Sequence, residues 1–229
     1  MYKGVLFVDI DGTVLRDSLF VLLVEALVRK GIFPASVKKY YAKEEKAYRH
    51  RQYRSAYVDF LRKMIEVFET NVKGVRVKDL VKVANEVVEE HKDEVHAHTR
   101  YLIRKALKNG WYVVAISSSQ KETVVPFAKY WGIQETHATE LGQQGGRYNG
   151  VRNLLLDKAK IVKKVLKRPE FRSVPRENTL AVGDSEGDIC MLEQVGKPIC
   201  FNPTQGLFDE AVKRNWSVVV EKKGVVYNI

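Results

Sequence analysis

The segment from Val5 to Thr13 constrains this chain more than any other. It reads Val-Leu-Phe-Val-Asp-Ile-Asp-Gly-Thr, a short apolar stretch that leads into two acids, a glycine and a threonine. The apolar run predicts a buried strand, and Gly12 lets the chain turn sharply after it. Side chains alternate along an extended chain, so Asp9 and Asp11 are expected on the same side of the backbone. The segment therefore predicts a strand that ends in an acidic loop.

Two carboxylates placed so close together repel each other unless a cation lies between them. A hard divalent ion held by oxygen ligands fits this pair, and Mg²⁺ is the ion we expect. One carboxylate would then be free for chemistry beside the metal. Two other interpretations stay open at this point: an ordinary polar loop, and the Asp-x-Asp of metal-dependent glycosyltransferases.

Composition bounds the class of protein. The chain has 229 residues, 45% of them hydrophobic, which suits one domain of ordinary size or a core with a modest insertion. Cys190 and Cys200 lie in apolar segments without metal-ligand spacing, which predicts buried, reduced thiols and a cytoplasmic protein. The apolar run over 19–28 is interrupted by Glu25 and is too short to span a bilayer. With no signal peptide expected before the first strand, we predict a soluble protein.

Positive charge is concentrated in one segment. The formal net charge is +11, and residues 29–63 hold eleven basic side chains against three acidic ones. Two interpretations fit this excess: a solvated helical face, or attraction of anionic substrates or polyanions.

Residues 16–95 have the pattern of a helical insertion. Apolar positions at spacings of three and four predict one helix over 19–30, two over 36–70 and another over 77–91. Gly31 and Pro34 separate the first of these from the second. The insertion is therefore expected to form a small all-helical domain.

Strands and helices alternate from residue 97 to the end. This order predicts an α/β fold with a mostly parallel sheet and helices on both of its faces. The glycine-rich stretch 142–150 is expected to form a hairpin or flap. Helices are predicted over 97–108, 121–131 and 157–167, and strands over 111–116, 137–141, 179–182, 198–201 and 217–220.

Ligands of such sheets bind at the carboxyl ends of the strands. Three polar segments follow predicted strands: the acidic loop at Asp9 and Asp11, the serines 117–119, and residues 183–188, which read Gly-Asp-Ser-Glu-Gly-Asp. We expect all three to line one crevice, which favours a functional site over an ordinary loop.

Four motifs in this order resemble those of the haloacid dehalogenase-like hydrolases, and most closely the phosphoserine phosphatase-like branch. They are Asp9–Thr13, Ser117 after an apolar strand, Lys158 at the start of a helix, and Gly183–Asp188. The resemblance implies a Rossmann-like core over 1–15 and 96–229 with a helical cap over 16–95. It also implies a Mg²⁺-dependent phosphatase that acts on a small phosphorylated metabolite through an aspartyl-phosphate intermediate.

The resemblance assigns the acids their roles. Asp9 would attack phosphorus, and Asp11 would protonate the leaving oxygen and later activate water, which requires a raised pKa. Asp9, Asp184 and Asp11, the last through its backbone carbonyl, would hold the metal. Asp188 would bind a metal water or orient Lys158.

The same resemblance provides the phosphate-binding groups. Ser117 would hold phosphoryl oxygens together with nearby amides, although a simple helix cap is an alternative for this serine. Lys158 would neutralise charge that develops during the reaction, with Lys160 as the reserve candidate. The remaining members of the predicted substrate-binding set are Gly12, Thr13 and Ser118.

Substrate choice is less constrained by the sequence. Where phosphoserine phosphatases typically carry a glutamate after the first motif, this chain has Ser18, with Asp17 beside it. A serine cannot pair with an ammonium as a carboxylate does, so phosphoserine itself is not the expected substrate.

Two other functions stay open. One is a phosphotransferase that passes the phosphoryl group to an alcohol. The other is a nucleic-acid or polyanion binding protein, since the basic insertion also contains several tyrosines. The spacing of His91, His96 and His98 fits no zinc site, and these side chains are expected at the surface.

Overall fold

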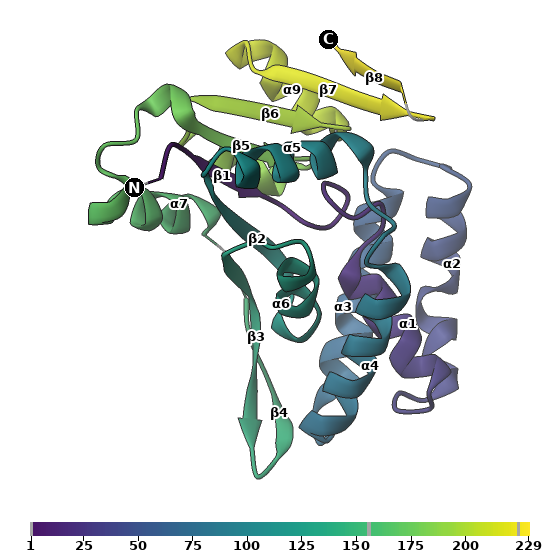
Figure 1. Cartoon of the computed structure of the whole chain (residues 1–229). Helices are drawn as coiled ribbons and strands as arrows, with labels where there is room; N and C mark the ends of the chain where they lie inside the picture. Colours follow the sequence, from purple (N-terminus) through teal and green to yellow (C-terminus); the bar gives the residue numbers. More distant parts are fainter. Residues whose placement is uncertain (1, 155–156, 224) are drawn as a thin grey trace.

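The computed structural model describes residues 2–154, 157–223 and 225–229 (Figure 1). Residues 1, 155, 156 and 224 fall within the predicted core and lie outside the described residues. A sheet of eight strands runs through the molecule, and a group of helices stands beside one end of it.

The sheet has the strand order β4-β3-β2-β1-β5-β6-β7-β8. Its six inner strands are parallel, and the two edge strands pair antiparallel to their neighbours. The sequence-based prediction of an α/β fold with a mostly parallel sheet is confirmed. The strands are β1 Val5–Val8, β2 Tyr112–Gln120, β3 Glu135–Gln144, β4 Arg147–Asn153, β5 Thr179–Gly183, β6 Lys197–Phe201, β7 Ser217–Lys222 and β8 Val225–Asn228.

Helices cover both faces of the sheet because every residue of the central strand β1 is apolar and buried. Leu6 and Val8 belong to the hydrophobic cluster on one face, and Val5 and Phe7 belong to the cluster on the other. The first face is packed by α5 (Ala97–Lys108) and α6 (Lys121–Tyr130); the second is packed by α7 (Lys158–Leu166), α8 (Ile189–Leu192) and α9 (Gln205–Arg214).

The insertion after β1 forms four α-helices with a hydrophobic core of their own, as Figure 1 shows. The chain enters and leaves this group along two neighbouring segments. The Arg16 amide donates to the Glu94 carbonyl at 3.0 Å, and the His96 amide donates to the Val14 carbonyl at 3.0 Å. The division of the chain at 15/16 and 95/96 stays a prediction. The helices are α1 Leu19–Arg29, α2 Lys38–Arg49, α3 Ala56–Val72 and α4 Val77–His91.

Strands β3 and β4 form the predicted hairpin, and its tip docks on the helical group. Gly74 donates its amide to the Tyr148 carbonyl at 2.8 Å, and the Tyr148 amide donates to the Val75 carbonyl at 2.9 Å. The buried side chains of Leu141 and Tyr148 belong to the same hydrophobic cluster as the helices. The hairpin is therefore packed against the helices that stand over the sheet.

Several elements differ from the sequence-based predictions. Strand β2 continues through Ser117, Ser118 and Ser119, because an irregularity in its pairing with β3 takes up these polar residues. The short strand β8 escaped prediction, since its four residues are all exposed and give no burial pattern. Cys200 is buried as expected, whereas Cys190 is only partly buried; both thiols are free.

The three histidines that were expected at the surface, His91, His96 and His98, are partly exposed and partly buried. The rings of His96 and His98 lie 4.9 and 5.7 Å from that of Phe201, because the start of α5 packs over the end of β6. The helices of the described residues include none with the length and apolar character required to cross a bilayer.

Glu135 joins the start of β3 to the segment that follows α7. Its carboxylate accepts two hydrogen bonds from Arg168, both at 2.6 Å, and one from Tyr112 at 3.0 Å. Burial alone would raise the pKa of Glu135, but the hydrogen bonds from Arg168, His137 and Tyr112 outweigh it and lower the pKa to about 2.

Glu135→Gln is expected to lower the free energy of unfolding by about 2 kcal/mol at pH 7. Because the folded-state pKa lies below the unfolded value, this stabilisation is complete above pH 4.5 and is lost as the pH falls toward 2. Urea unfolding of both proteins across this range measures the effect. Glu140→Gln, which removes an exposed partner of Lys121, is the control and should cost less than about 0.5 kcal/mol. Equal losses for the two variants at pH 7 would contradict the prediction.

Candidate active site

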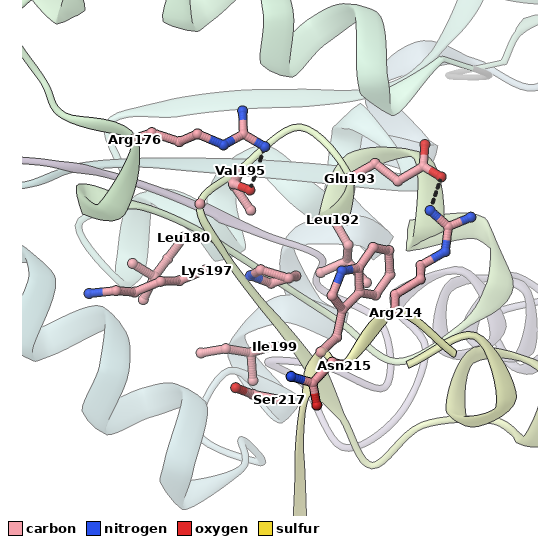
Figure 2. Close-up of a pocket in the computed structure, with 13 residues that line it drawn as sticks. Arg176, Leu180, Leu192, Glu193, Val195, Lys197, Ile199, Arg214, Asn215 and Ser217 are labelled. Atoms are coloured by element: carbon pink, nitrogen blue, oxygen red, sulfur yellow. Dashed lines mark hydrogen bonds and ion pairs between the residues drawn. The ribbon is translucent and has the colours of Figure 1, made fainter. Parts of the chain in front are cut away.

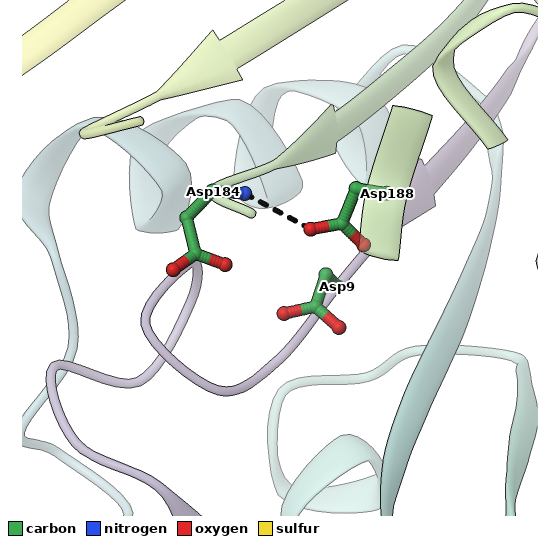
Figure 3. Close-up of side chains that lie close together, drawn as sticks. All are labelled: Asp9, Asp184 and Asp188. Atoms are coloured by element: carbon green, nitrogen blue, oxygen red, sulfur yellow. Dashed lines mark hydrogen bonds between the residues drawn. The ribbon is translucent and has the colours of Figure 1, made fainter. Parts of the chain in front are cut away.

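Three carboxylates meet at the carboxyl end of the central strands. Figure 3 shows Asp9 after β1 beside Asp184 and Asp188, which follow β5. One oxygen of each lies within 4.8 Å of the others. Strands β1 and β5 are parallel neighbours, so the loops after them emerge at the same edge of the sheet. The convergence expected for Asp9 and Asp184 is therefore a product of the strand order.

Two glycines make this close approach possible. Gly12 has a φ of +76°, and a Cβ at this position would lie 2.5 Å from Oδ2 of Asp184. A Cβ at Gly183 would lie 2.4 Å from the Cγ of Asp188. Any side chain at either position would push the acidic loops apart.

Lys158 bridges two of the acids. Its Nζ lies 2.6 Å from Oδ1 of Asp9 and 2.6 Å from Oδ1 of Asp188, and 8% of its side chain is exposed. Burial opposes the charged form, but the two carboxylates outweigh burial and raise the pKa of Lys158, so the ammonium stays protonated. Asp157 caps α7 by accepting from the Lys160 amide at 2.8 Å. Lys158 therefore points inward, while Lys160 is exposed.

Asp188 orders the loop as well as the lysine. Its Oδ2 accepts from the amides of Asp184 and Ser185 and from the Ser185 hydroxyl, each at 3.1 Å. The side chain is completely buried. Asp188 thus contacts Lys158 with one oxygen and holds the backbone that carries Asp184 with the other.

Asp11 has a separate set of partners. Its Oδ2 accepts from the hydroxyls of Ser117 and Ser119, both at 2.8 Å, and its Oδ1 accepts from the Leu19 amide at 2.5 Å. Burial raises the pKa of Asp11, and these three hydrogen bonds lower it, with burial the larger effect. A carboxyl group with a raised pKa is suited to hold and release a proton near neutral pH.

The acids carry more charge than the lysine can balance. Asp9, Asp11, Asp184 and Asp188 surround one ammonium, an excess of three formal negative charges in a buried region. Burial is the largest cause of the raised pKa of Asp9, which Lys158 opposes, and of Asp184, whose pKa reaches about 7. A donor set of carboxylate oxygens with excess negative charge fits a hard divalent cation.

All of these groups except Asp188 line a cavity of about 490 Å³. Asp9, Asp11, Lys158 and Asp184 lie on the floor, and Ser118 and Ser119 of β2 lie beside them. The opposite wall comes from the helices of the insertion and is mostly apolar: Phe20, Tyr57, Val58, Leu61 and Ile65. The helical group therefore covers the acidic site.

The order of these polar segments along the chain matches a known family. The model of the haloacid dehalogenase-like hydrolases matches residues 6–193, which include every acid of the site. The chain belongs to this family.

Several proteins that are similar to this haloacid dehalogenase-like hydrolase are named as phosphatases. It is 33% identical over 110 residues to a protein named a probable phosphatase of Mycobacterium tuberculosis, covering 47% of this chain but only 37% of that protein. It is 24% identical to a histidinol-phosphatase of Neisseria meningitidis, over 95% of this chain and 98% of that one. A phosphoserine phosphatase structure with a phospho-aspartyl intermediate analogue has a TM-score of 0.62 at 18% identity, covering 97% and 95% of the two chains.

The structure distributes the predicted site residues over two layers of the hydrolase. Asp9, Asp11, Ser118, Lys158 and Asp184 line the cavity. The others lie behind these residues and support them. The Thr13 hydroxyl donates to Oδ1 of Asp184 at 3.1 Å, and the completely buried Ser117 donates to Asp11. The phosphoryl contact expected of Ser117 stays a prediction.

Tyr57 and Arg152 also line the cavity, and sequence reasoning gave neither of them a role in the site. Ser119 was expected at the crevice as one of the serines 117–119, but its hydrogen bond to Asp11 was not predicted, although it lies two positions after Ser117 and shares its side of an extended strand. Tyr57 gave no distinct signal, since it is one of several tyrosines in a basic segment. Arg152 lies in the hairpin, whose docking on the helices is a long-range contact.

A larger cavity, of about 640 Å³, lies at the opposite edge of the sheet, where β5, β6 and β7 begin (Figure 2). Two of its arginines already have partners in the protein. Arg176 donates to the Val195 carbonyl at 3.2 Å, and Arg214 pairs with Glu193 at 2.7 Å. We place the chemistry in the smaller cavity, because that is where the buried acids and Lys158 converge.

Proposed function

We propose that this hydrolase is a Mg²⁺-dependent phosphatase of small phosphorylated metabolites, and that Asp9 forms an aspartyl-phosphate. The observation that carries the proposal is the buried Asp9 carboxylate, paired with Lys158 and close to two further acids, at the floor of a covered cavity. The phosphatase names of the relatives support the same reaction.

The first half of the reaction uses both acids after β1. A carboxylate oxygen of Asp9 attacks phosphorus, and the bond from phosphorus to the ester oxygen breaks. Asp11 gives its proton to that oxygen, so the product leaves as a neutral alcohol. Lys158, already in contact with Asp9, offsets negative charge as it develops.

The second half restores the enzyme. Asp11, now a carboxylate, takes a proton from water while the water oxygen attacks the phosphorus of the aspartyl-phosphate. The bond from phosphorus to the Asp9 oxygen breaks, Asp9 leaves as a carboxylate, and inorganic phosphate is released. Asp9 and Asp11 are then back in their starting states. Asp9 and Asp184, with the Asp11 backbone carbonyl, would hold Mg²⁺, which when bound screens the phosphoryl charge from these acids.

The metal requirement gives the direct test. Hydrolysis of phenyl phosphate is expected to fall at least about 100-fold after chelation with EDTA and to return on addition of Mg²⁺, since a catalytic metal contributes several kcal/mol. Asp184→Asn should shift the Mg²⁺ concentration for half-maximal rate upward. Hydrolysis that is indifferent to chelation, or absent with every metal tried, would overturn the proposal.

Two alternatives give different results in the same assay. A phosphotransferase would release phenol faster than phosphate when glycerol is added, whereas a hydrolase releases both equally. A polyanion-binding protein would bind nucleic acid in a salt-sensitive way and leave phenyl phosphate intact. The basic segment offers limited support for the latter, because Arg49, Arg62 and Lys63 pair with Glu45, Asp59 and Glu66.

A further inference from the structure

The active-site cavity contains a second buried cation besides Lys158. Arg152 of β4 lines the same cavity as Asp9, and 8% of its side chain is exposed. Its guanidinium carbon lies 5.4 Å from the centre of the Phe20 ring, on the wall formed by the helices. The hairpin holds it there, because Leu141, its partner residue across β3 and β4, is buried in the core of the helical group.

Arg152 has unused hydrogen-bonding capacity. One donor nitrogen, Nη1, donates to Oε1 of Glu69 at 3.3 Å, and that glutamate side chain is 47% exposed. Its Nε is buried and has no hydrogen-bond partner among the described residues. A guanidinium carries five N–H donors in a planar fork, and the one hydrogen bond to Glu69 uses only one of them. A buried donor without a partner costs free energy unless a ligand accepts a hydrogen bond from it.

The surroundings of Arg152 leave room for an anion. The Phe20 ring beside Arg152 offers no charge of either sign, and neither do Leu61 and Ile65 elsewhere on the helical wall of the cavity. The acids of the cavity lie on the floor or, for Glu186, at its exposed core-side rim, where Glu186 already accepts from Thr204 at 2.9 Å. Lys158 is engaged with two carboxylates, so Arg152 is the cation in this cavity with free donors among the described residues.

We propose that Arg152 binds a second anionic group of the substrate. The substrate would then be a phosphate monoester whose alcohol portion carries a carboxylate or another phosphate, with an apolar part packed against the apolar wall that contains Phe20 and Leu61. The phosphate to be cleaved would lie at Asp9 and the second anion at the hairpin. This inference rests on the proposed function and narrows its substrate class.

The test compares substrates that differ in the second anion. We expect 4-carboxyphenyl phosphate and 1,4-phenylene bisphosphate to be hydrolysed with higher kcat/KM than phenyl phosphate. The kcat/KM of each anionic ester, divided by the kcat/KM of phenyl phosphate, should fall about 10- to 100-fold in Arg152→Gln. The change should lie mainly in KM, because an ion pair made equally in ground and transition states affects binding. The anionic ester whose ratio falls more in Arg152→Gln carries the group that Arg152 prefers.

Glu69→Gln is the matched control. It removes the surface partner of Arg152 but keeps the guanidinium, so the substrate ratio should stay within about twofold of the wild-type ratio. If Arg152 only tethers the hairpin to α3, both variants would lower kcat/KM for every ester by the same factor. That result, or a wild-type ratio that Arg152→Gln does not change, would overturn the inference.

A binding measurement keeps the inference separate from the phosphatase proposal. Titration calorimetry of benzylphosphonate and 4-carboxybenzylphosphonate, which resist hydrolysis, compares the same pair without turnover. Wild type should bind the carboxylated compound at least about tenfold more tightly, and Arg152→Gln should remove the difference. If wild type did not hydrolyse phenyl phosphate but still showed this binding difference, the phosphatase proposal would be refuted and the anion site would stand. Normal hydrolysis of phenyl phosphate without the binding difference would refute the anion site alone.

Discussion

Asp9→Asn is expected to lower kcat for phenyl phosphate at least about 10⁴-fold, which is the largest effect on activity that the structure predicts. The amide is a far poorer nucleophile than the carboxylate. The other carboxylate beside Lys158, that of Asp188, is completely buried and accepts from the amides of Asp184 and Ser185, so it is not free to replace Asp9. Steady-state phosphate release measures the loss. Mass spectrometry of acid-quenched wild type should show phosphate attached to a peptide that contains Asp9.

Asp209→Asn provides the control for this change. Asp209 is an exposed residue of α9, and its carboxylate accepts from Gln205 on the same helix. The variant makes the same chemical substitution away from the cavity and should keep the wild-type rate. If Asp9→Asn retained more than about 1% of the wild-type kcat with an unchanged Mg²⁺ requirement, Asp9 could not be the nucleophile.

The acids on the floor of the site could be predicted from the sequence, because each of them follows an apolar strand. Asp9 and Asp11 line one cavity, as their alternation predicts, although their carboxylates have different partners. Parallel pairing of β1 with β5 then brings Asp184 alongside. These contacts need only local patterns and one general rule about parallel sheets.

Two further features of the site could be settled only from the structure. On the floor, whether Lys158 or Lys160 enters the site depends on the helix start at Asp157, which a uniformly basic helix does not reveal. Arg152 reaches the cavity because the hairpin packs on α3 and on the loop before α4, contacts between segments about 75 residues apart, such as Gly74 with Tyr148. Such packing depends on tertiary structure, and no local periodicity encodes it.

Lys158→Met is expected to have the largest effect on stability. The substitution removes the ammonium that lies 2.6 Å from both Asp9 and Asp188 and leaves two buried carboxylates without a counter-charge. Breaking such a buried pair costs about 3–5 kcal/mol of unfolding free energy in metal-free protein at pH 7. Urea unfolding in EDTA measures this loss, and kcat should also fall about 1000-fold because the charge on the phosphoryl group is no longer offset.

The pH dependence of this variant follows from the charge that is removed. Lys158 lowers the pKa of Asp9, so without it the folded variant holds the Asp9 proton to higher pH than folded wild type does. The folded variant then binds more protons than folded wild type, and the stability of the variant relative to wild type should decrease as the pH rises from 5 to 8. Mg²⁺ should restore part of the loss by supplying positive charge to the same acids. Lys160→Met, an exposed change in the same helix turn, should cost less than about 0.5 kcal/mol; equal losses for the two lysine variants would show that the buried ion pairs do not stabilise the fold.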